Sequence, residues 1–119
     1  MRKYAAEKLA ARKASRELVV EIFRLTEKMP QKAKVTLGVE LRKAATSLSS
    51  YVTEGSSRNE QEEQTDLLLL AYESLVEISN KLIIAKRLSV VHPKSFEILQ
   101  LRIKDLAVKI NKVAKPDEA

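Results

Sequence analysis

The chain has 119 residues, of which 45% are apolar and 32% charged, and its formal net charge is +6. It contains no Cys, which excludes disulfides, thiol catalysis and thiolate metal sites. The amino terminus lacks the apolar run of a signal peptide, and no stretch approaches the roughly 20 apolar residues of a membrane span. A cytoplasmic protein with no membrane partner is therefore expected.

Turn-forming residues are scarce, with two Gly and three Pro in the whole chain. Because Gly and Pro interrupt regular structure, their scarcity predicts few turns and long helices. An all-β domain would need more aromatic residues than the 4% present here. At this length the chain is expected to form a single domain over residues 1–119.

The first predicted helix spans about residues 4–28, where apolar side chains recur every three or four positions. The pair Met29-Pro30 ends it, because the residue before a proline is pushed out of the helical region. The second predicted helix spans about residues 37–54. Gly55 follows it directly, at the position where a left-handed cap is favoured.

Residues 53–66 form a polar stretch without one large apolar side chain. Either Ser57 with Glu60 or Asn59 with Glu62 has the spacing of a capping box at a helix start. Acidic residues in the first turns of that helix would also be favoured by the helix dipole. The stretch is therefore interpreted as a corner between two helices and not as a linker between domains.

The third predicted helix spans about residues 60–88 and is apolar around more of its circumference than a surface helix needs. One heptad-like seam suits a core. A second apolar stripe consists of Leu69, Tyr72, Val76 and Ile83. The remaining apolar positions are candidate contacts with another subunit, and they are Leu67, Leu70, Ile84 and Leu88. The helix is therefore either central or also packed against a second molecule.

The fourth predicted helix spans about residues 93–115, with Pro93 at its first position. His92, just before it, is interpreted as a capping or turn residue. All connections are short, so consecutive helices are expected to be antiparallel. The predicted fold is all-α, an up-down-up-down four-helix bundle.

No pattern for catalysis or cofactor binding emerges from the sequence. His92 is the only histidine, and the carboxylates at residues 60–66 are explained by a helix start. No Glu-x-x-His pair of the di-metal bundles occurs, and the two glycines are isolated, so no phosphate loop is present. We expect no enzyme, no metal, no cofactor and no small-molecule substrate.

The charges are segregated along the chain: residues 1–43 carry a net +7, residues 44–80 a net −6 and residues 81–119 a net +5. This pattern permits contacts with the phosphate backbone of a nucleic acid. It equally permits the acidic block of one subunit to meet a basic block of another, or a solvated surface. The candidate nucleic-acid-binding residues are Arg12, Arg16, Arg42, Lys43, Arg58, Lys109 and Lys112.

Three segments resemble a known family in the family's order: KASRELVVEIFRLTEKMP (13–30), LRKAATSLSSYVTEG (41–55) and ESLVEISNKLIIAKRL (73–88). The chain is similar to the four-helix bundle proteins encoded within intervening sequences of bacterial 23S ribosomal RNA. Arg58, just after the Glu54-Gly55 corner, belongs to the same signature. The resemblance covers nearly the whole chain, from about residue 13 to residue 112.

The resemblance implies a four-helix bundle that assembles as a homo-oligomer, commonly a homopentamer, without enzymatic activity. It also connects the chain to a related bundle, the accessory protein of diversity-generating retroelements, which binds nucleic acid and a reverse transcriptase. The expected partners are accordingly further copies of the chain together with RNA or DNA. A protein-interaction scaffold without direct nucleic-acid binding is the alternative.

Overall fold

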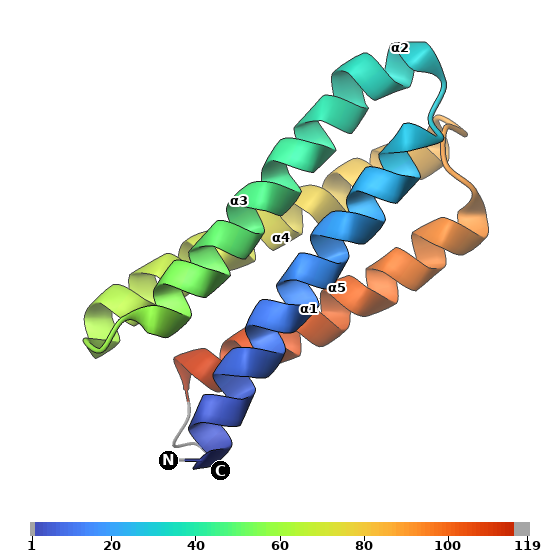
Figure 1. Ribbon diagram of the computed structural model, residues 1–119. Helices are drawn as coiled ribbons and strands as arrows, with labels where there is room; N and C mark the ends of the chain where they lie inside the picture. Colours follow the sequence, from blue (N-terminus) through green and yellow to red (C-terminus); the bar gives the residue numbers. More distant parts are fainter. Residues whose placement is uncertain (1, 116–119) are drawn as a thin grey trace.

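The computed structural model describes residues 2–115 and shows four long helices in one bundle (Figure 1). These are α1 (Arg2–Glu27), α3 (Val39–Ser57), α4 (Gln61–Arg87) and α5 (Pro93–Ala114). A short helix α2 (Gln31–Ala33) and a π-helical segment η1 (Lys34–Gly38) lead directly into α3. No strand occurs within the described range, so the prediction of an all-α fold is confirmed.

Consecutive long helices run in opposite directions, as the colour sequence in Figure 1 shows. Helix α3 packs against both α1 and α4, and α5 also packs against both α1 and α4. Helices α1 and α4 are therefore diagonal neighbours, and the bundle is elongated, with extents of 46 × 22 × 18 Å. This arrangement gives the molecule two broad side faces of interest, one along the α1–α3 seam and one along the α4–α5 seam.

The core is the set of side chains that the 3.6-residue period marks as inward-facing. On α4 the predicted seam residues are all buried, and they are Leu68, Ala71, Leu75, Ile78, Leu82 and Ala85. On α5 the predicted seam begins at Phe96, which is half-buried, and continues through the buried residues Leu99, Ile103, Leu106, Ile110 and Val113. Burying one Leu or Ile side chain contributes about 1.5–3 kcal/mol, so these two helices are held chiefly by their seams.

The second helix begins earlier than predicted. The helical backbone starts at Gln31, directly after Pro30, and passes through the π-helical segment into α3. Pro30 has φ −55° and ψ 147°, a conformation that precedes a helix start, and its carbonyl accepts the first backbone hydrogen bond from Lys34. The turn between the first two helices is therefore only a few residues long.

The predicted corner at Gly55 is wrong in its position. Gly55 lies inside α3, no described glycine has positive φ, and the helix continues to Ser57. The helix continues because Gly55 is buried against α4, where a β-carbon would lie 3.0 Å from Leu68 Cδ2. The lack of a side chain at Gly55 lets α3 and α4 pack closely. The helix ends at Arg58, whose backbone is extended.

The predicted capping boxes are also wrong. Glu60 occupies the N-cap position of α4, and no side chain there accepts a hydrogen bond. Ser57 belongs to α3, where its hydroxyl donates to the carbonyl of Thr53. At the start of α5, in contrast, His92 is the N-cap as predicted, because its Nδ1 accepts a hydrogen bond from the backbone N–H of Lys94 at 3.1 Å.

Helix α4 ends in a left-handed residue that is not glycine. Ser89 has φ 58°. Its N–H donates to the carbonyl of Lys86, and the N–H of Val90 donates to the carbonyl of Ala85. This pair of bonds is a Schellman motif, which satisfies the last carbonyls of the helix and reverses the chain toward α5.

Candidate nucleic-acid interface

Arg12 reaches from α1 across to the end of α3. Its Nε donates to the hydroxyl of Ser56 at 2.7 Å, and its Nη2 donates to the hydroxyl of Ser57 at 3.2 Å. Both partners are neutral, and no carboxylate of the described residues forms an ion pair with Arg12. The guanidinium is thus fixed in place while its positive charge remains available to an anion.

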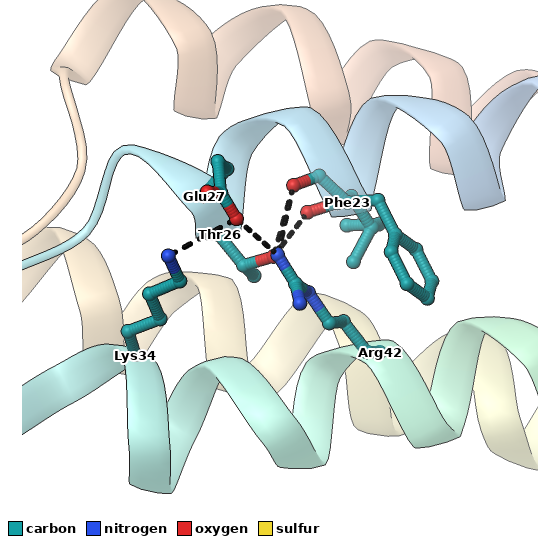
Figure 2. Close-up of polar contacts among 6 residues, drawn as sticks. Phe23, Thr26, Glu27, Lys34 and Arg42 are labelled. Atoms are coloured by element: carbon teal, nitrogen blue, oxygen red, sulfur yellow. Dashed lines mark hydrogen bonds and ion pairs between the residues drawn. The ribbon is translucent and has the colours of Figure 1, made fainter. Parts of the chain in front are cut away.

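Arg42 reaches in the opposite direction, from α3 back to the end of α1. Its Nε donates to the Thr26 hydroxyl at 2.7 Å, its Nη2 donates to the carbonyl of Phe23 at 3.3 Å, and its guanidinium lies 4.7 Å from the Phe23 ring centre. Figure 2 shows Arg42 and Lys34 converging on Glu27, with ion-pair distances of 3.1 and 3.0 Å. Arg42 therefore joins α1 to α3, and a carboxylate partly offsets its charge.

The two neighbouring cations change the pKa of the Glu27 carboxyl group. Hydrogen bonds from Lys34 and from Arg42 lower the pKa of Glu27 below its ordinary value, and the charges of both cations act in the same direction. Glu27 is consequently ionised over the whole neutral range. Its negative charge is balanced by two cations, so the α1–α3 seam stays positive overall at this point.

The remaining candidate cations are distributed over two sides of the bundle. Arg16 is exposed one helical turn after Arg12 on α1, while Lys43 and Arg58 are exposed on α3 and at its C-cap. Lys109 on α5 pairs with Asp105, and Lys112 is exposed near the end of α5. The structure therefore brings Arg12, Arg16 and Arg42 together along the α1–α3 seam but leaves the two α5 lysines on a different helix.

The α1–α3 seam also carries hydroxyl groups that the sequence reasoning did not assign to this surface. Ser15 is buried, and its hydroxyl shares a hydrogen bond with Ser49 across the seam at 3.3 Å. Thr46 and Thr53 lie two turns apart on α3 and are exposed. Ser15 and Thr46 already donate to backbone carbonyls of α1 and α3, so the arginines of the seam, and not these hydroxyls, supply the hydrogen-bond donors for an anion.

The candidate oligomer contacts on α4 differ in exposure. Leu67 is half-buried, and its Cβ would lie 3.1 Å from a β-carbon at Gly55, so it packs inside the monomer. Leu70, Ile84 and Leu88 are exposed, the last by 62%. Three of the four proposed residues are thus free to meet a second molecule.

A second apolar surface on α4 faces α5. It consists of the exposed residues Leu69, Tyr72, Val76 and Ile83. These side chains line two adjoining hollows of about 610 and 640 Å³ between the helices, both also bordered by Lys104. The sequence showed that α4 carries more apolar residues than one core needs. It did not show that this stripe lies beside α5.

No group of three or more potential metal ligands gathers among the residues that the structure describes. Within the same range, no helix is both long enough and apolar enough to cross a membrane.

The number and order of the long helices match what the sequence motifs imply. A family model described as 23S rRNA-intervening sequence protein matches residues 7–112. The chain belongs to this family. The match spans all four long helices of the intervening-sequence protein and includes the α1–α3 seam with Arg12, Arg16 and Arg42.

Membership supports the observed fold, and the intervening-sequence family is not known for an enzymatic activity. A comparison of this intervening-sequence protein with curated proteins finds no match.

Proposed function

We propose that this intervening-sequence protein is a non-enzymatic bundle that binds the phosphate backbone of RNA or DNA and works as a homo-oligomer. The observation that carries the proposal is the state of Arg12. Its guanidinium is held by the hydroxyls of Ser56 and Ser57, and no carboxylate of the described residues neutralises it.

An arginine in this state suits a phosphate for two reasons. A guanidinium offers several N–H donors in one plane, and those that are not used by the serines can engage two phosphate oxygens at once. Because its position is already fixed, less side-chain freedom is lost on binding. Arg16, exposed on the next turn, adds a second charge on the same side of α1.

The character of the surface favours backbone contacts over base contacts. Phe23 on this seam is covered by the Arg42 guanidinium, and within residues 4–115 no exposed aromatic side chain lies between Arg12 and Arg16 as a base-stacking platform would require. Contacts of cations and hydroxyls with phosphate and sugar position a nucleic acid without reading its sequence. The protein is therefore expected to bind nucleic acids of different sequence with similar affinity.

The experiment compares the parent with Arg12→Gln/Arg16→Gln in fluorescence anisotropy titrations with labelled RNA and duplex DNA over a range of salt. Losing two phosphate contacts should flatten the slope of log affinity against log salt by roughly 1.8 on duplex DNA. The matched control is Arg102→Gln/Lys115→Gln, which removes the same charge from exposed positions of α5 and its C-cap. Arg16→Gln alone, at an exposed position, keeps the test informative if loss of the Arg12 hydrogen bonds disturbs folding.

A parent protein that binds no nucleic acid at low salt would overturn the proposal. Equal losses of affinity in the double variant and in the control would show that binding depends on net charge and not on the α1–α3 seam.

A protein-interaction scaffold is the second candidate, and the exposed apolar residues of α4 favour it. Leu70 and Ile84 are 40% and 41% exposed, on the flank of α4 that turns away from the α5 hollows. Large apolar side chains that recur along one helix mark a contact surface more often than a solvated one. The molecular mass of the protein in solution, measured by light scattering, tests whether copies of the chain cover them.

A further inference from the structure

One end of the bundle is strongly basic, and none of the candidate nucleic-acid-binding residues named from the sequence lies there. It is formed by residues 24–34, which include the turn between α1 and α2, and residues 86–94, which include the loop between α4 and α5. These two segments carry seven Lys or Arg residues and one acidic residue, Glu27. We call this surface the basic end, and its cations are Arg24, Lys28, Lys32, Lys34, Lys86, Arg87 and Lys94.

The fold brings these two segments together although they lie about sixty positions apart in the chain. Figure 1 shows the turn after α1 beside the loop that connects α4 and α5. A hollow of about 350 Å³ lies between them, and residues of both segments line it, including Lys28 and His92. The predicted up-down-up-down topology already places the first and third connections at one end, but the hollow and the residues that line it could be found only in the structure.

Most of this charge is not offset inside the molecule. Lys28, Lys32, Arg87 and Lys94 are exposed, and none of them forms an ion pair with another described residue. Lys34 is one of the two cations on Glu27. At the opposite end the connection between α3 and α4 is acidic, since residues 54–66 carry five acidic residues and one arginine, while the end of α5 there carries Lys112 and Lys115.

Helix stability accounts for only part of the basic end. Cations are favourable in the last turn of a helix, which covers Arg24 on α1 and the end of α4. Lys94, however, lies in the first turn of α5, where the dipole favours a negative charge and no acidic residue is present. Lys32 likewise follows the start of the helical run at Gln31. Helix α4 begins at the opposite end with Glu62 and Glu63, as the dipole prefers.

The basic end continues the α1–α3 seam. Along α1, Arg12 and Lys28 are separated by about 24 Å at 1.5 Å per residue. Arg16 lies between them, and Arg42 bonds to the last turn of α1 on the same seam, followed by Lys34 through their shared partner Glu27. A positive track therefore runs along the seam toward the end that carries Lys28 and Lys32.

We infer that the basic end is a second contact surface for the phosphate backbone, and that a bound strand passes from the α1–α3 seam onto it. The inference rests on the proposed function, because it names a further part of the same binding surface. The un-neutralised lysines at two helix starts lower local stability, and a polyanion bound over them removes that repulsion.

The test uses Lys28→Gln/Lys32→Gln/Lys94→Gln and a single-stranded uridine homopolymer long enough to span the bundle. Loss of three phosphate contacts should flatten the salt slope by about 2 and weaken binding at low salt by on the order of tenfold. The matched control, Lys13→Gln/Arg102→Gln/Lys115→Gln, removes the same charge from exposed positions outside the basic end and should change affinity much less. Circular dichroism checks that all variants are folded. Arg87→Gln/Lys94→Gln is a second variant of the basic end, and it should also weaken binding.

The outcomes separate this inference from the proposed function. If the parent binds and the basic-end variants bind equally well, the inference is overturned while binding through the α1–α3 seam stands. If the control triple weakens binding as much, net charge explains the effect and the inference is again overturned. A parent protein that fails to bind the homopolymer at low salt would overturn both the proposed function and this inference.

Discussion

Gly55 of α3 and Leu68 of α4 are packed so closely that a β-carbon on Gly55 would lie 3.0 Å from Leu68 Cδ2 and 3.1 Å from Leu68 Cγ. The Cβ of Leu67 would lie equally close, at 3.1 Å. Few real β-carbons have such short contacts, so α3 and α4 could not adopt this separation with a larger residue at position 55. The glycine thereby fixes the spacing of the two helices at the end where α4 begins.

Gly55→Ala should destabilise the protein, while Gly38→Ala should not. In a helix, Ala is favoured over Gly by about 1 kcal/mol, and both glycines have helical neighbours. At Gly55 the overpacking cost of about 1–3 kcal/mol exceeds this gain, since the Cβ of Leu67 sits next to the backbone and has little room to move. At Gly38 the nearest atoms are at 3.5 Å, an ordinary contact.

Urea unfolding followed by circular dichroism measures both glycine variants. The free energy of unfolding should fall by about 1 kcal/mol for Gly55→Ala and rise by up to about 1 kcal/mol for Gly38→Ala. A stabilised Gly55→Ala variant would show that α4 shifts freely and that the close approach has no structural role.

Ser89→Gly should stabilise the protein, because Ser89 holds a left-handed conformation at φ 58°. That conformation costs a residue with a side chain about 1–2 kcal/mol relative to glycine. Glycine loses more backbone freedom on folding, which reduces the net gain to roughly 0.5–1 kcal/mol. Ser89→Val, with a branched β-carbon, should destabilise, and thermal unfolding of the two variants gives the comparison. Equal melting temperatures would mean that the Schellman motif opens easily in solution.

The four helices and their inward faces could be predicted from the sequence, because burial follows the period of apolar residues. The helix ends could not all be predicted in the same way. At residue 55 the choice between a left-handed cap and a helical glycine depends on how near α4 lies, which is a tertiary property. At residue 37 the start of the predicted helix was placed too late, because the apolar period weakens in the polar run from Gln31 to Lys34 although the backbone is already helical.

The candidate interface was predictable only in part. The sequence identified Arg12 and Arg16 as basic, but not that Ser56 and Ser57 hold Arg12 without neutralising it. Arg42 was identified by charge alone, whereas its contacts with Phe23 and Thr26 also join two helices. Neutral partners of an arginine leave no trace in a charge count, so this distinction needs the structure.

Acid should weaken the junction of α1 and α3 through Glu27. Its pKa is lowered in the folded protein, first by the hydrogen bond from Lys34 and then by that from Arg42. A lowered folded-state pKa means that the ionised carboxylate stabilises the fold above its unfolded-state pKa. That contribution is lost as the pH falls through the lowered, folded-state pKa.

Glu27→Gln should therefore be less stable than the parent at neutral pH, and the difference should shrink in acid. Urea unfolding at a series of pH values measures it, and NMR titration of the Glu27 carboxyl gives its pKa directly. In Lys34→Met that pKa should rise toward its ordinary value, since Lys34 is the largest cause of the shift. A difference between Glu27→Gln and the parent that does not change with pH would argue against the ion pairs.

The two apolar flanks of α4 predict different results in assembly experiments. If copies of the chain meet through the flank of α4 that carries Leu70, Ile84 and Leu88, Leu70→Lys and Ile84→Lys should give folded monomers. A lysine buried in that contact would lose its hydration. Val76→Lys, on the flank that lines the α5 hollows, should leave that assembly intact. Light scattering of the parent and the three variants distinguishes the flanks. Dissociation by Val76→Lys alone would move the contact to the α4–α5 side, and a monomeric parent would exclude self-assembly through either flank.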